Sequence, residues 1–268
     1  MSDSRKNIHL EKLTPENEEE VLELLAKDVL LNLTLIADCT QLRSWCDVSV
    51  LYEQENIEGV FSLYSDLSLP AIAFHATSNE KLSILFNTYR TKIGDSDFIC
   101  ICGDKQISML REICKIEESV FECQMVLPSL SEFNYSTSLT PIALDSKSIP
   151  SLNKLYELAG NPAWTPNAID LGPYYGIVDS SGNILSAAGV HYVTKYAAEV
   201  GNVATLPEAR KLGYASACVE AVVRDLSNIT DTIVLHFFAA NDAARKLYEN
   251  MGFVYSKHNP LYFVRGRY

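Results

Sequence analysis

The sequence lacks the long apolar runs and the excess of basic residues that mark two large classes of protein. No stretch of 18 apolar residues occurs, and the first residues lack the apolar core of a signal peptide, so neither a membrane span nor secretion is expected. The 22 basic residues are outnumbered by 34 acidic ones, which gives a net charge of −12. This balance argues against a general nucleic-acid binder, which needs a net basic surface. It is typical of a soluble protein and compatible with a cationic substrate.

Metal-ligand and disulfide spacings are missing as well. The seven cysteines are odd in number and no pair is spaced C-x-x-C, so reduced thiols in a cytoplasmic protein explain them best. The five histidines are scattered without an H-x-x-x-H pair. We therefore expect no metal site.

What is present is the composition of a globular chain. Hydrophobic residues make up 47% of the 268 residues, enough to bury a core in one large domain or two small ones. The segment 128–141 is rich in Ser, Thr and Pro, which is typical of a linker. We therefore predict two domains, 1–135 and 136–268.

Hydrophobic periodicity predicts the same order of elements in both halves: a helix, two or three strands, then helix, strand, helix and strand. The first helix is expected from Thr14 to Leu35, with Thr14 as its cap. Strands are expected at 71–76, 184–193, 199–205 and 233–239, and a short apolar run lies at 98–102. Helices are expected at 79–89, near 105–113, after Gly213 to about Leu226, and at 241–251. The repeated order indicates either two versions of one α/β fold or the alternation that any α/β chain shows.

The segment from Asn202 to Ala215 has the pattern of an anion-binding loop. A strand ends, the loop carries Arg210 and Lys211, and small residues at Gly213 and Ala215 open a helix. Free amides at a helix start, together with the helix dipole, suit a phosphate. G-x-G-x-x-G and G-x-x-x-x-G-K-[ST] are both absent, so a dinucleotide fold or a nucleotide-hydrolysing P-loop is not expected. Alone, such a loop is not specific for phosphate.

The predicted helix 241–251 carries a stripe that can border a cofactor. Asn241 is a suitable N-cap, and Tyr248 lies two turns further on the same face. Ala244 lies between them and leaves that face shallow. In the alternative interpretation Asn241 only caps the helix, and Tyr248 packs with Leu247 and Met251.

Together the two segments carry a family resemblance. Arg210-x-x-Gly213-x-Ala215 and Asn241-x-x-Ala244-x-x-x-Tyr248-x-x-x-Gly252-Phe253 resemble the GNAT superfamily of N-acetyltransferases. The first looks like the acyl-CoA pyrophosphate loop, [RQ]-x-x-G-x-[GA], and the second like the helix on the cofactor side. The resemblance is specific over 187–263. One departure is Lys211, where the family commonly has glycine.

The resemblance implies a fold and its duplication. The fold class is α/β (α+β), a GNAT-like mixed, mostly antiparallel twisted sheet flanked by helices and present as two tandem domains. The subgroup it looks most like has a degenerate N-terminal half, as in glycine N-acyltransferase-like enzymes. Where the C-terminal half has its phosphate loop, residues 76–81 read ATSNEK without glycine. The N-terminal domain should therefore not bind CoA in the same manner.

The resemblance also implies a reaction: transfer of an acetyl group from acetyl-CoA to a primary amine of a small molecule or amino acid, by direct attack and without a metal. By family position Tyr248 is the candidate acid, because a phenol is protonated at neutral pH and can donate to the leaving thiolate. Glu199, on the strand before the loop, is the candidate base. The alternative for Glu199 is a solvated strand carboxylate.

The remaining candidates follow from the same resemblance. Cofactor contacts are implied for the strand, the loop, the helix start and the second helix, namely Val203, Thr205, Arg210, Lys211, Leu212, Gly213, Tyr214, Ala215, Asn241 and Ala244. The acceptor pocket should be bordered by the loop 161–175 and the hairpin 174–193, with Trp164, Tyr174, Tyr175 and His191 as candidates. Their alternative is ordinary core packing.

Two other functions stay open at this point. One is a GNAT-shaped regulatory module that binds CoA without catalysis, and the other is a protein or peptide N-acetyltransferase whose N-terminal half docks a partner. GNAT proteins often form dimers, and the terminal strand ending at Tyr268 is where a second copy would pair across a two-fold axis. Partners expected here are a small amine substrate, with no nucleic acid and no membrane.

Overall fold

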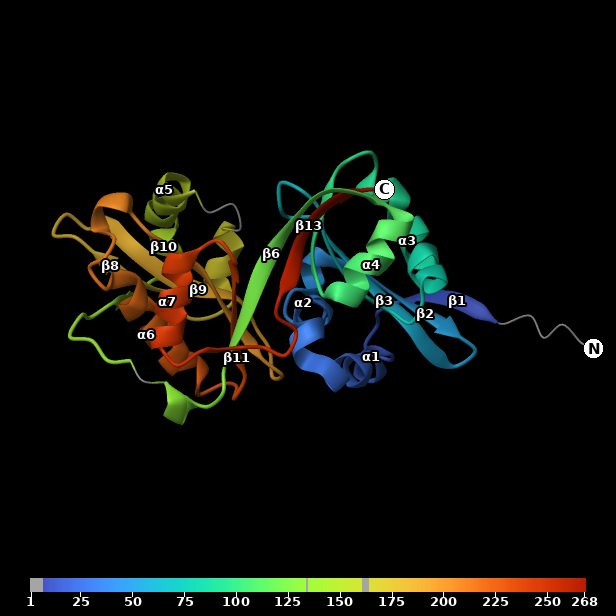
Figure 1. Ribbon diagram of the computed structural model, residues 1–268, viewed down its shortest axis with the longest axis horizontal. Coiled ribbons are helices and arrows are strands. Elements are labelled where there is room, and N and C mark those ends of the chain that lie inside the picture. The colour runs from blue at the N-terminus through green and yellow to red at the C-terminus, as the bar shows by residue number, and fades with distance from the viewer. Residues whose placement is uncertain (1–6, 134, 161–163) are drawn as a thin grey trace, which may run out of the picture. The chain divides into compact units, whose positions relative to one another are not determined.

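The computed structural model describes residues 7–133, 135–160 and 164–268, and the chain forms two compact units (Figure 1). The first unit contains the residues up to 122 together with 260–268, and the second contains 123–259. These units differ from the predicted domains 1–135 and 136–268, because the C-terminal strand pairs within the first unit. Among the described residues, no helix has the length and apolar character needed to cross a membrane.

The first unit is a mixed sheet in the order β1-β2-β3-β4-β5-β13-β6, covered by helices. Its strands are β1 (Ile8–Lys12), β2 (Cys46–Glu53), β3 (Asn56–Tyr64), β4 (Ala71–Ala76), β5 (Phe98–Cys102), β13 (Leu261–Arg267) and the first part of β6 (Lys115–Leu127). Its helices are α1 (Glu18–Leu25), α2 (Val29–Cys39), α3 (Asn79–Ile93) and α4 (Asp104–Ile113). Every strand pair is antiparallel except β4 and β5, which are parallel and joined at Ala71 and Ile99.

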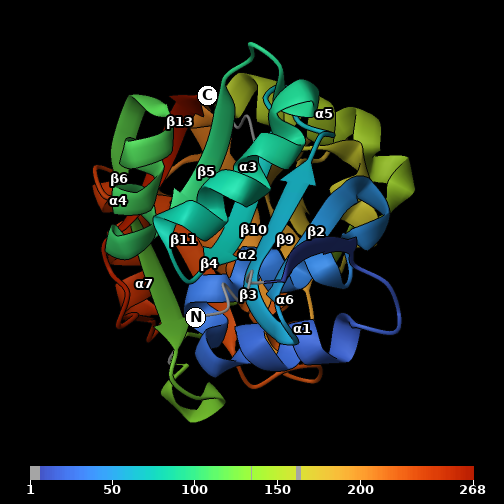
Figure 2. The ribbon, with the colours of Figure 1, turned by 90° about the vertical axis from the view of Figure 1, so that its right-hand side faces the viewer.

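Aromatic rings fill the core under α3, which lies across β3 and β4 (Figure 2). Phe86 on the helix contacts Phe61 and Phe98 on the strands, each at 5.4 Å between ring centroids. Both contacts are edge-on, the geometry that aromatic pairs prefer. The apolar face of α3 thus fixes the helix on this sheet.

The predicted single helix from Thr14 to Leu35 is wrong, because the structure has two helices separated by a 3₁₀ turn at Ala26–Asp28. Asp28 leaves the helical conformation (φ −145°, ψ 80°), and its carboxylate accepts a hydrogen bond from the Leu31 amide at 3.4 Å. Asp28 therefore caps α2 and starts a new helix, a role for which aspartate is favoured.

The second unit is a mixed sheet in the order β6-β11-β10-β9-β8-β7, with β12 paired to β6. Its strands are the second part of β6, β7 (Ile142–Ala143), β8 (Tyr175–Val178), β9 (Ile184–Val193), β10 (Ala198–Thr205), β11 (Ile233–Phe238) and β12 (Val254–Tyr255). Its helices are α5 (Ile149–Ala159), α6 (Tyr214–Leu226) and α7 (Asp242–Asn250). The remaining 3₁₀ turns are 43–45, 130–132, 146–148, 166–170 and 207–209. The mixed, mostly antiparallel sheet with helices confirms the predicted fold class.

Strands β10 and β11 run parallel but pair only at their beginnings within the described register. Ala198, Glu199 and Val200 lie opposite Ile233, Val234 and Leu235, and β10 then continues beside β9 alone. A bulge at Asn202, whose φ is +51°, bends β10 just beyond the last pair. The two strands therefore part after Val200, which opens the sheet at this point.

The C-terminal strand is an interior strand of the first unit. β13 pairs with β5 along one edge and with β6 along the other, and Figure 1 shows it (red) beside β6 (green). Both edges of β13 are thus hydrogen-bonded. The expected pairing of this strand across a two-fold axis is corrected accordingly, because the strand has no open edge for a second copy.

Candidate functional site

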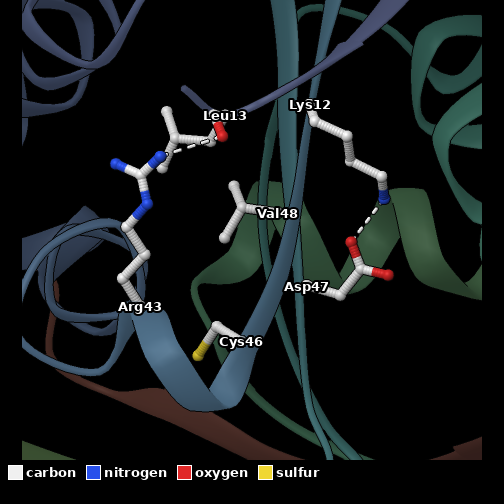
Figure 3. A pocket seen from close by; sticks show the side chains of 6 residues that line it. All are labelled: Lys12, Leu13, Arg43, Cys46, Asp47 and Val48. Carbon is white, nitrogen blue, oxygen red and sulfur yellow. Dashed lines mark hydrogen bonds and ion pairs between the residues drawn. The ribbon is translucent and has the colours of Figure 1, made fainter. Parts of the chain in front are cut away.

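The first unit holds a cavity of about 180 Å³ lined by Lys12, Leu13, Arg43, Cys46, Asp47 and Val48 (Figure 3). Its charged groups are paired with groups of the unit itself. Lys12 binds Asp47, while Arg43 binds Glu18 and donates to the Leu13 carbonyl at 2.9 Å. Cations compensated in this way give an anion little to bind, so we place the candidate site in the second unit.

A buried carboxylate, Glu199, is the centre of that site. Its side chain lies on β10, and the residue is 3% exposed. One carboxylate oxygen, Oε1, lies 2.9 Å from His191 Nδ1 and 3.0 Å from His236 Nδ1. The other oxygen, Oε2, accepts a hydrogen bond from the Tyr192 hydroxyl. Glu199 is therefore not the solvated carboxylate of the alternative interpretation.

A β-bulge brings two consecutive residues of β9 to the same carboxylate. Successive side chains of a strand normally point to opposite faces of the sheet. On β9, Val190 pairs with Val200 and Tyr192 with Glu199, so His191 is the extra residue of the bulge. Both His191 and Tyr192 can then reach Glu199.

The hydrogen bonds also settle how the cluster holds its protons. A carboxylate only accepts, so the imidazoles of His191 and His236 carry a proton on Nδ1. The Gln124 side-chain amide lies 3.0 Å from His236 Nε2, so both ring nitrogens of His236 have a partner within the unit. Burial raises the pKa of Glu199, but its interactions with His236 and His191 outweigh burial and hold the pKa well below its usual range. Glu199 is thus a buried anion with partners at both carboxylate oxygens.

Two imidazoles and a carboxylate are also a common metal-ligand set. Here, however, the Nδ1 atoms of both histidines point at the carboxylate oxygen itself rather than at a shared point beyond it. Within the described part of the chain, no group of three or more histidine, cysteine, aspartate or glutamate residues is arranged to hold a metal ion.

The predicted phosphate loop forms an uncapped helix start. Gly213 is the N-cap of α6 with a left-handed backbone (φ +80°), and no side chain of the described residues caps the helix. Lys211 is also left-handed (φ +65°), which explains why glycine suits that position in related loops. Arg210 is exposed, and its Nε donates to the Thr205 carbonyl at 3.3 Å. Leu212 and Gly213 are exposed as well, and Tyr214 and Ala215 are half-buried, so the amides at the helix start have no side-chain cap at a partly exposed surface.

The second predicted cofactor segment, α7, begins as its sequence indicates. The Asn241 side chain accepts a hydrogen bond from the Ala244 amide at 3.1 Å, so Asn241 caps the helix. Tyr248 is 5% exposed, and its ring packs 5.7 Å from Phe237 and 6.1 Å from Phe253. Burial raises the pKa of Tyr248, so the phenol stays protonated at neutral pH.

The Glu199 cluster and Tyr248 lie on opposite faces of the sheet. His236 and Phe237 are successive residues of β11 and point to opposite faces. His236 contacts Glu199, whereas Phe237 packs on Tyr248. The parting of β10 and β11 after Val200 lies between the two groups. Val203 and Thr205 are on the stretch of β10 that follows the parting, and the Thr205 hydroxyl contacts Ser186 Oγ at 2.8 Å.

The four predicted acceptor residues have different partners in the structure. Trp164 packs edge-on against Tyr174, with 5.8 Å between ring centroids. Tyr174 is 2% exposed and lies on Gly189, where an added Cβ would be 2.1 Å from the ring. Tyr175 instead donates to Asp225 on α6 at 2.6 Å, and His191 belongs to the Glu199 cluster. Residues 161–163 of the predicted border loop lie outside the described residues.

Several residues of the cluster escaped the sequence reasoning. Tyr192, His236 and Gln124 contact the site, but no local motif contains them. The position of His236 follows from the pairing of β11 with β10, and that of Tyr192 from the bulge at His191. The sequence shows how side chains alternate along each strand. It does not show the register between strands, which brings these residues together.

The comparisons with known proteins concern both the second unit and the whole fold. Residues 174–262 match the family model described as FR47-like protein. A Drosophila protein has the same fold with a TM-score of 0.74 at 13% identity, covering 95% of this chain and 98% of that one. A tandem GNAT protein from the clavulanic acid biosynthesis pathway gives 0.64 at 9% identity, covering 97% and 98%. A GCN5-related N-acetyltransferase from Sphaerobacter thermophilus gives 0.63 at 10%, covering 97% and 95%. No curated protein has a significantly similar sequence.

These likenesses confirm the predicted fold. The chain has the GNAT acetyltransferase fold, it matches tandem GNAT structures along nearly its whole length, and its C-terminal part contains an FR47-like domain.

Proposed function

We propose that the protein is an acetyl-CoA-dependent N-acetyltransferase that acts on the primary amine of a small molecule or amino acid. The observation that carries this proposal is the parting of β10 and β11 after Val200. A buried phenol, Tyr248, lies on one face of the sheet at this point, and the Glu199 cluster lies on the other. In this proposal the proton donor for the leaving group therefore lies on one face of the sheet, and the proton acceptor for the amine lies on the other.

The residues of the loop and of the start of α6 fit the cofactor. Gly213 has no Cβ where the loop turns into the helix, and the amides from Leu212 to Ala215 precede the first helical bonds. Such an uncapped helix start, with Arg210 and Lys211 beside it, is suited to a pyrophosphate. Tyr214 and Ala244 are partly exposed, as contact residues must be. Acetyl-CoA, when bound there, supplies the activated acyl thioester.

The two faces of the sheet divide the proton chemistry. Tyr248 is buried and protonated, so it can donate a proton to the leaving sulfur. The Glu199 cluster takes the proton that the attacking amine loses. Glu199 itself keeps its negative charge in a site from which water is largely excluded, and this charge stabilises a developing cation on the acceptor face.

The first unit has the same succession of elements as the second. At the positions that correspond to the proposed cofactor site, however, it has a capped helix start and different side chains. α3 follows β4 as α6 follows β10, yet its start is capped by Ser78, whose hydroxyl accepts from the Lys81 amide. α4 follows β5 as α7 follows β11. Its third residue, Gln106, takes the place of Ala244, and its seventh, Leu110, that of Tyr248.

Gln106 also closes the gap between the parallel strands of that unit. Its amide donates to the Phe74 carbonyl on β4 at 2.8 Å and accepts from the Gly103 amide after β5 at 3.0 Å. In our proposal the first unit is a GNAT-like copy without a CoA site.

Calorimetric titration of the full chain with acetyl-CoA tests the cofactor assignment. We expect one site per chain with a Kd near 1 µM, about −8 kcal/mol. Absence of binding heat at millimolar acetyl-CoA would contradict the proposal. Binding without acyl transfer to any small amine would favour a non-catalytic CoA module, and transfer to peptides alone would favour a protein N-acetyltransferase.

A further inference from the structure

We propose that His191, rather than Glu199, is the general base of this site, and that Glu199 is a positioning residue that orients the His191 imidazole. The inference rests on the proposed acyl transfer, and it replaces the role that the family resemblance gave to Glu199.

Both carboxylate oxygens of Glu199 already have partners within the unit. Oε1 receives both imidazole Nδ1 atoms, and Oε2 receives the Tyr192 hydroxyl. A proton on Glu199 would neutralise the buried anion that these three partners hold, and so weaken all three interactions. A partner of Glu199 is therefore better placed to accept the proton.

One ring nitrogen of His191 is left unused by the cluster. Its Nδ1 is held by Glu199, whereas its Nε2 is buried and has no hydrogen-bond partner among the described residues. The same edge of the ring fills the space where a side chain of residue 201 would be. A Cβ built on Gly201 would lie 2.5 Å from both Nε2 and Cδ2 of His191. Gly201 is the first residue after the last β10–β11 pair, so Nε2 lies where these strands part.

His236 is the other imidazole of the cluster, and its surroundings exclude it from the same role. Its Nε2 receives the Gln124 amide, and its side chain is 6% exposed. The His191 side chain is 33% exposed. His191 thus keeps part of its ring toward solvent, a substrate has to reach Nε2 where β10 and β11 part, and His236 holds Glu199 in place.

The titratable groups around His191 come from several elements. Tyr192 lies on its own strand, Glu199 on β10 and His236 on β11. The phenols of Tyr156 on α5 and Tyr174 before β8 donate instead to main-chain carbonyls of Asn202 and Val190, at 2.7 and 3.2 Å. Glu199 is thus the one charged group in contact with the imidazole among the described residues.

The proton step balances without a further reactant. The amine nitrogen forms a bond to the acyl carbon with its lone pair, and the C–S bond of the thioester breaks with its electron pair on sulfur. One N–H bond of the amine breaks, its electron pair stays on nitrogen, and the proton forms a bond to His191 Nε2. Tyr248 gives one proton to the leaving sulfur on the other face. The imidazolium then returns its proton to solvent and Tyr248 regains one, so both residues return to their starting states.

The tautomer of His191 tests the inference without any acceptor. Nitrogen-15 NMR of the full chain at pH 8, assigned with a His191→Gln variant, should show His191 protonated on Nδ1 and unprotonated on Nε2. A His191 protonated on Nε2, or on both nitrogens, would overturn the inference. This outcome is separate from failure of the proposed function, which would appear as no acetyl-CoA binding.

Kinetics with the best amine of a small-amine panel provide the second test. His191→Ala should lower kcat by at least 100-fold with acetyl-CoA affinity unchanged, and added imidazole should restore part of the rate. Gly201→Ala, which displaces the ring, should lower kcat similarly. His258→Ala, a histidine outside the cluster, is the matched control. A kcat of His191→Ala within fivefold of the wild-type value would overturn the inference. An equal loss of kcat in His236→Gln alone would overturn it too.

The positioning role of Glu199 has its own readout. Glu199→Gln removes the anion that holds the His191 proton on Nδ1, so nitrogen-15 NMR of this variant should show the proton shared between the two ring nitrogens, and kcat should fall with little change in the KM for the amine. A His191 ring that stays protonated on Nδ1 alone in Glu199→Gln would show that the carboxylate does not act through the ring.

Discussion

Single side chains set the chemistry on each face of the second sheet. Glu199 is an anion held by three donors, and Tyr248 is a phenol whose pKa is raised by burial. Such pairs, with environments that push their proton affinities apart, are typical of acid–base sites. The ring of Tyr248 packs against Phe237 and Phe253, and its hydroxyl places one polar group in this aromatic core.

Replacing Tyr248 with Phe should therefore separate chemistry from binding. The ring contacts with Phe237 and Phe253 survive, so acetyl-CoA affinity should change by less than about twofold, while kcat falls by about 100-fold or more through loss of the donor. Steady-state kinetics and calorimetry measure the two effects. Tyr255→Phe, a half-exposed tyrosine of the same unit, is the control, and equal kcat values in the two variants would refute the acid assignment.

A buried acid in the first unit makes its stability depend on pH. Burial raises the pKa of Asp38 to about 6, in spite of hydrogen bonds from Ser62 and Cys46. The folded chain then binds this proton more tightly than the unfolded chain, whose value is about 3.9. The stabilisation is complete below about pH 4 and is lost as pH rises through 6.

Asp38→Asn should remove that dependence. Relative to wild type, its free energy of unfolding should rise between pH 4 and pH 7 by up to about 3 kcal/mol. Urea unfolding across this range measures the difference, with the exposed Asp95→Asn as control. A constant difference between Asp38→Asn and wild type would show that Asp38 titrates normally.

At the scale of elements, bulges and helix starts create the site. The bulge at His191 directs two residues to Glu199, and the bulge at Asn202 bends β10 where it leaves β11. Asn202 is locked there, because its carbonyl accepts from Tyr156 and its side-chain amide donates to Tyr174, both at 2.7 Å. The first bulge brings the partners of Glu199 together, and the second lies just beyond the last β10–β11 pair, so these two irregularities position the site.

Gly213 at the start of α6 provides a test at this scale. Gly213→Ala forces a left-handed alanine, which should cost about 1–2 kcal/mol of stability and weaken acetyl-CoA binding at least tenfold. Gly182→Ala is a matched control, because Gly182 has the same left-handed φ (+82°) in the turn before β9. Both variants should be destabilised alike, as thermal unfolding can show. Equal acetyl-CoA affinities in the two would contradict the phosphate-loop assignment.

At the scale of the whole molecule, the C-terminal strand ties the end of the chain to the first unit. β13 pairs with β5 and β6, and Leu261 and Val264 are buried there. A chain that ends at Asn259 should therefore lose hydrogen-exchange protection in β5 and β6 and keep it in β9 and β10. A peptide of residues 260–268 should restore protection. Unchanged exchange in β5 would contradict this role of the strand.

The extent to which sequence predicts this molecule depends on the range of the interactions. The strands at 71–76 and 184–193 follow from local apolar patterns and were predicted with their observed bounds. The short, mostly polar β1 was not predicted. The periodicity predicted one helix where Asp28 ends the first and caps the second. The bulge at His191, the place of His236 and the position of β13 depend on pairing between distant residues, which no local pattern contains.

The most direct test of the central claim is acyl transfer itself. The full chain is mixed with acetyl-CoA and a panel of primary amines, and both the free thiol and the acetylated amine are measured. We predict amine-dependent release of thiol with an equal amount of N-acetylated product for at least one amine, and near-complete loss of both in Tyr248→Phe. Tight binding of acetyl-CoA with no acetylated amine from any member of the panel, peptides included, would contradict the account.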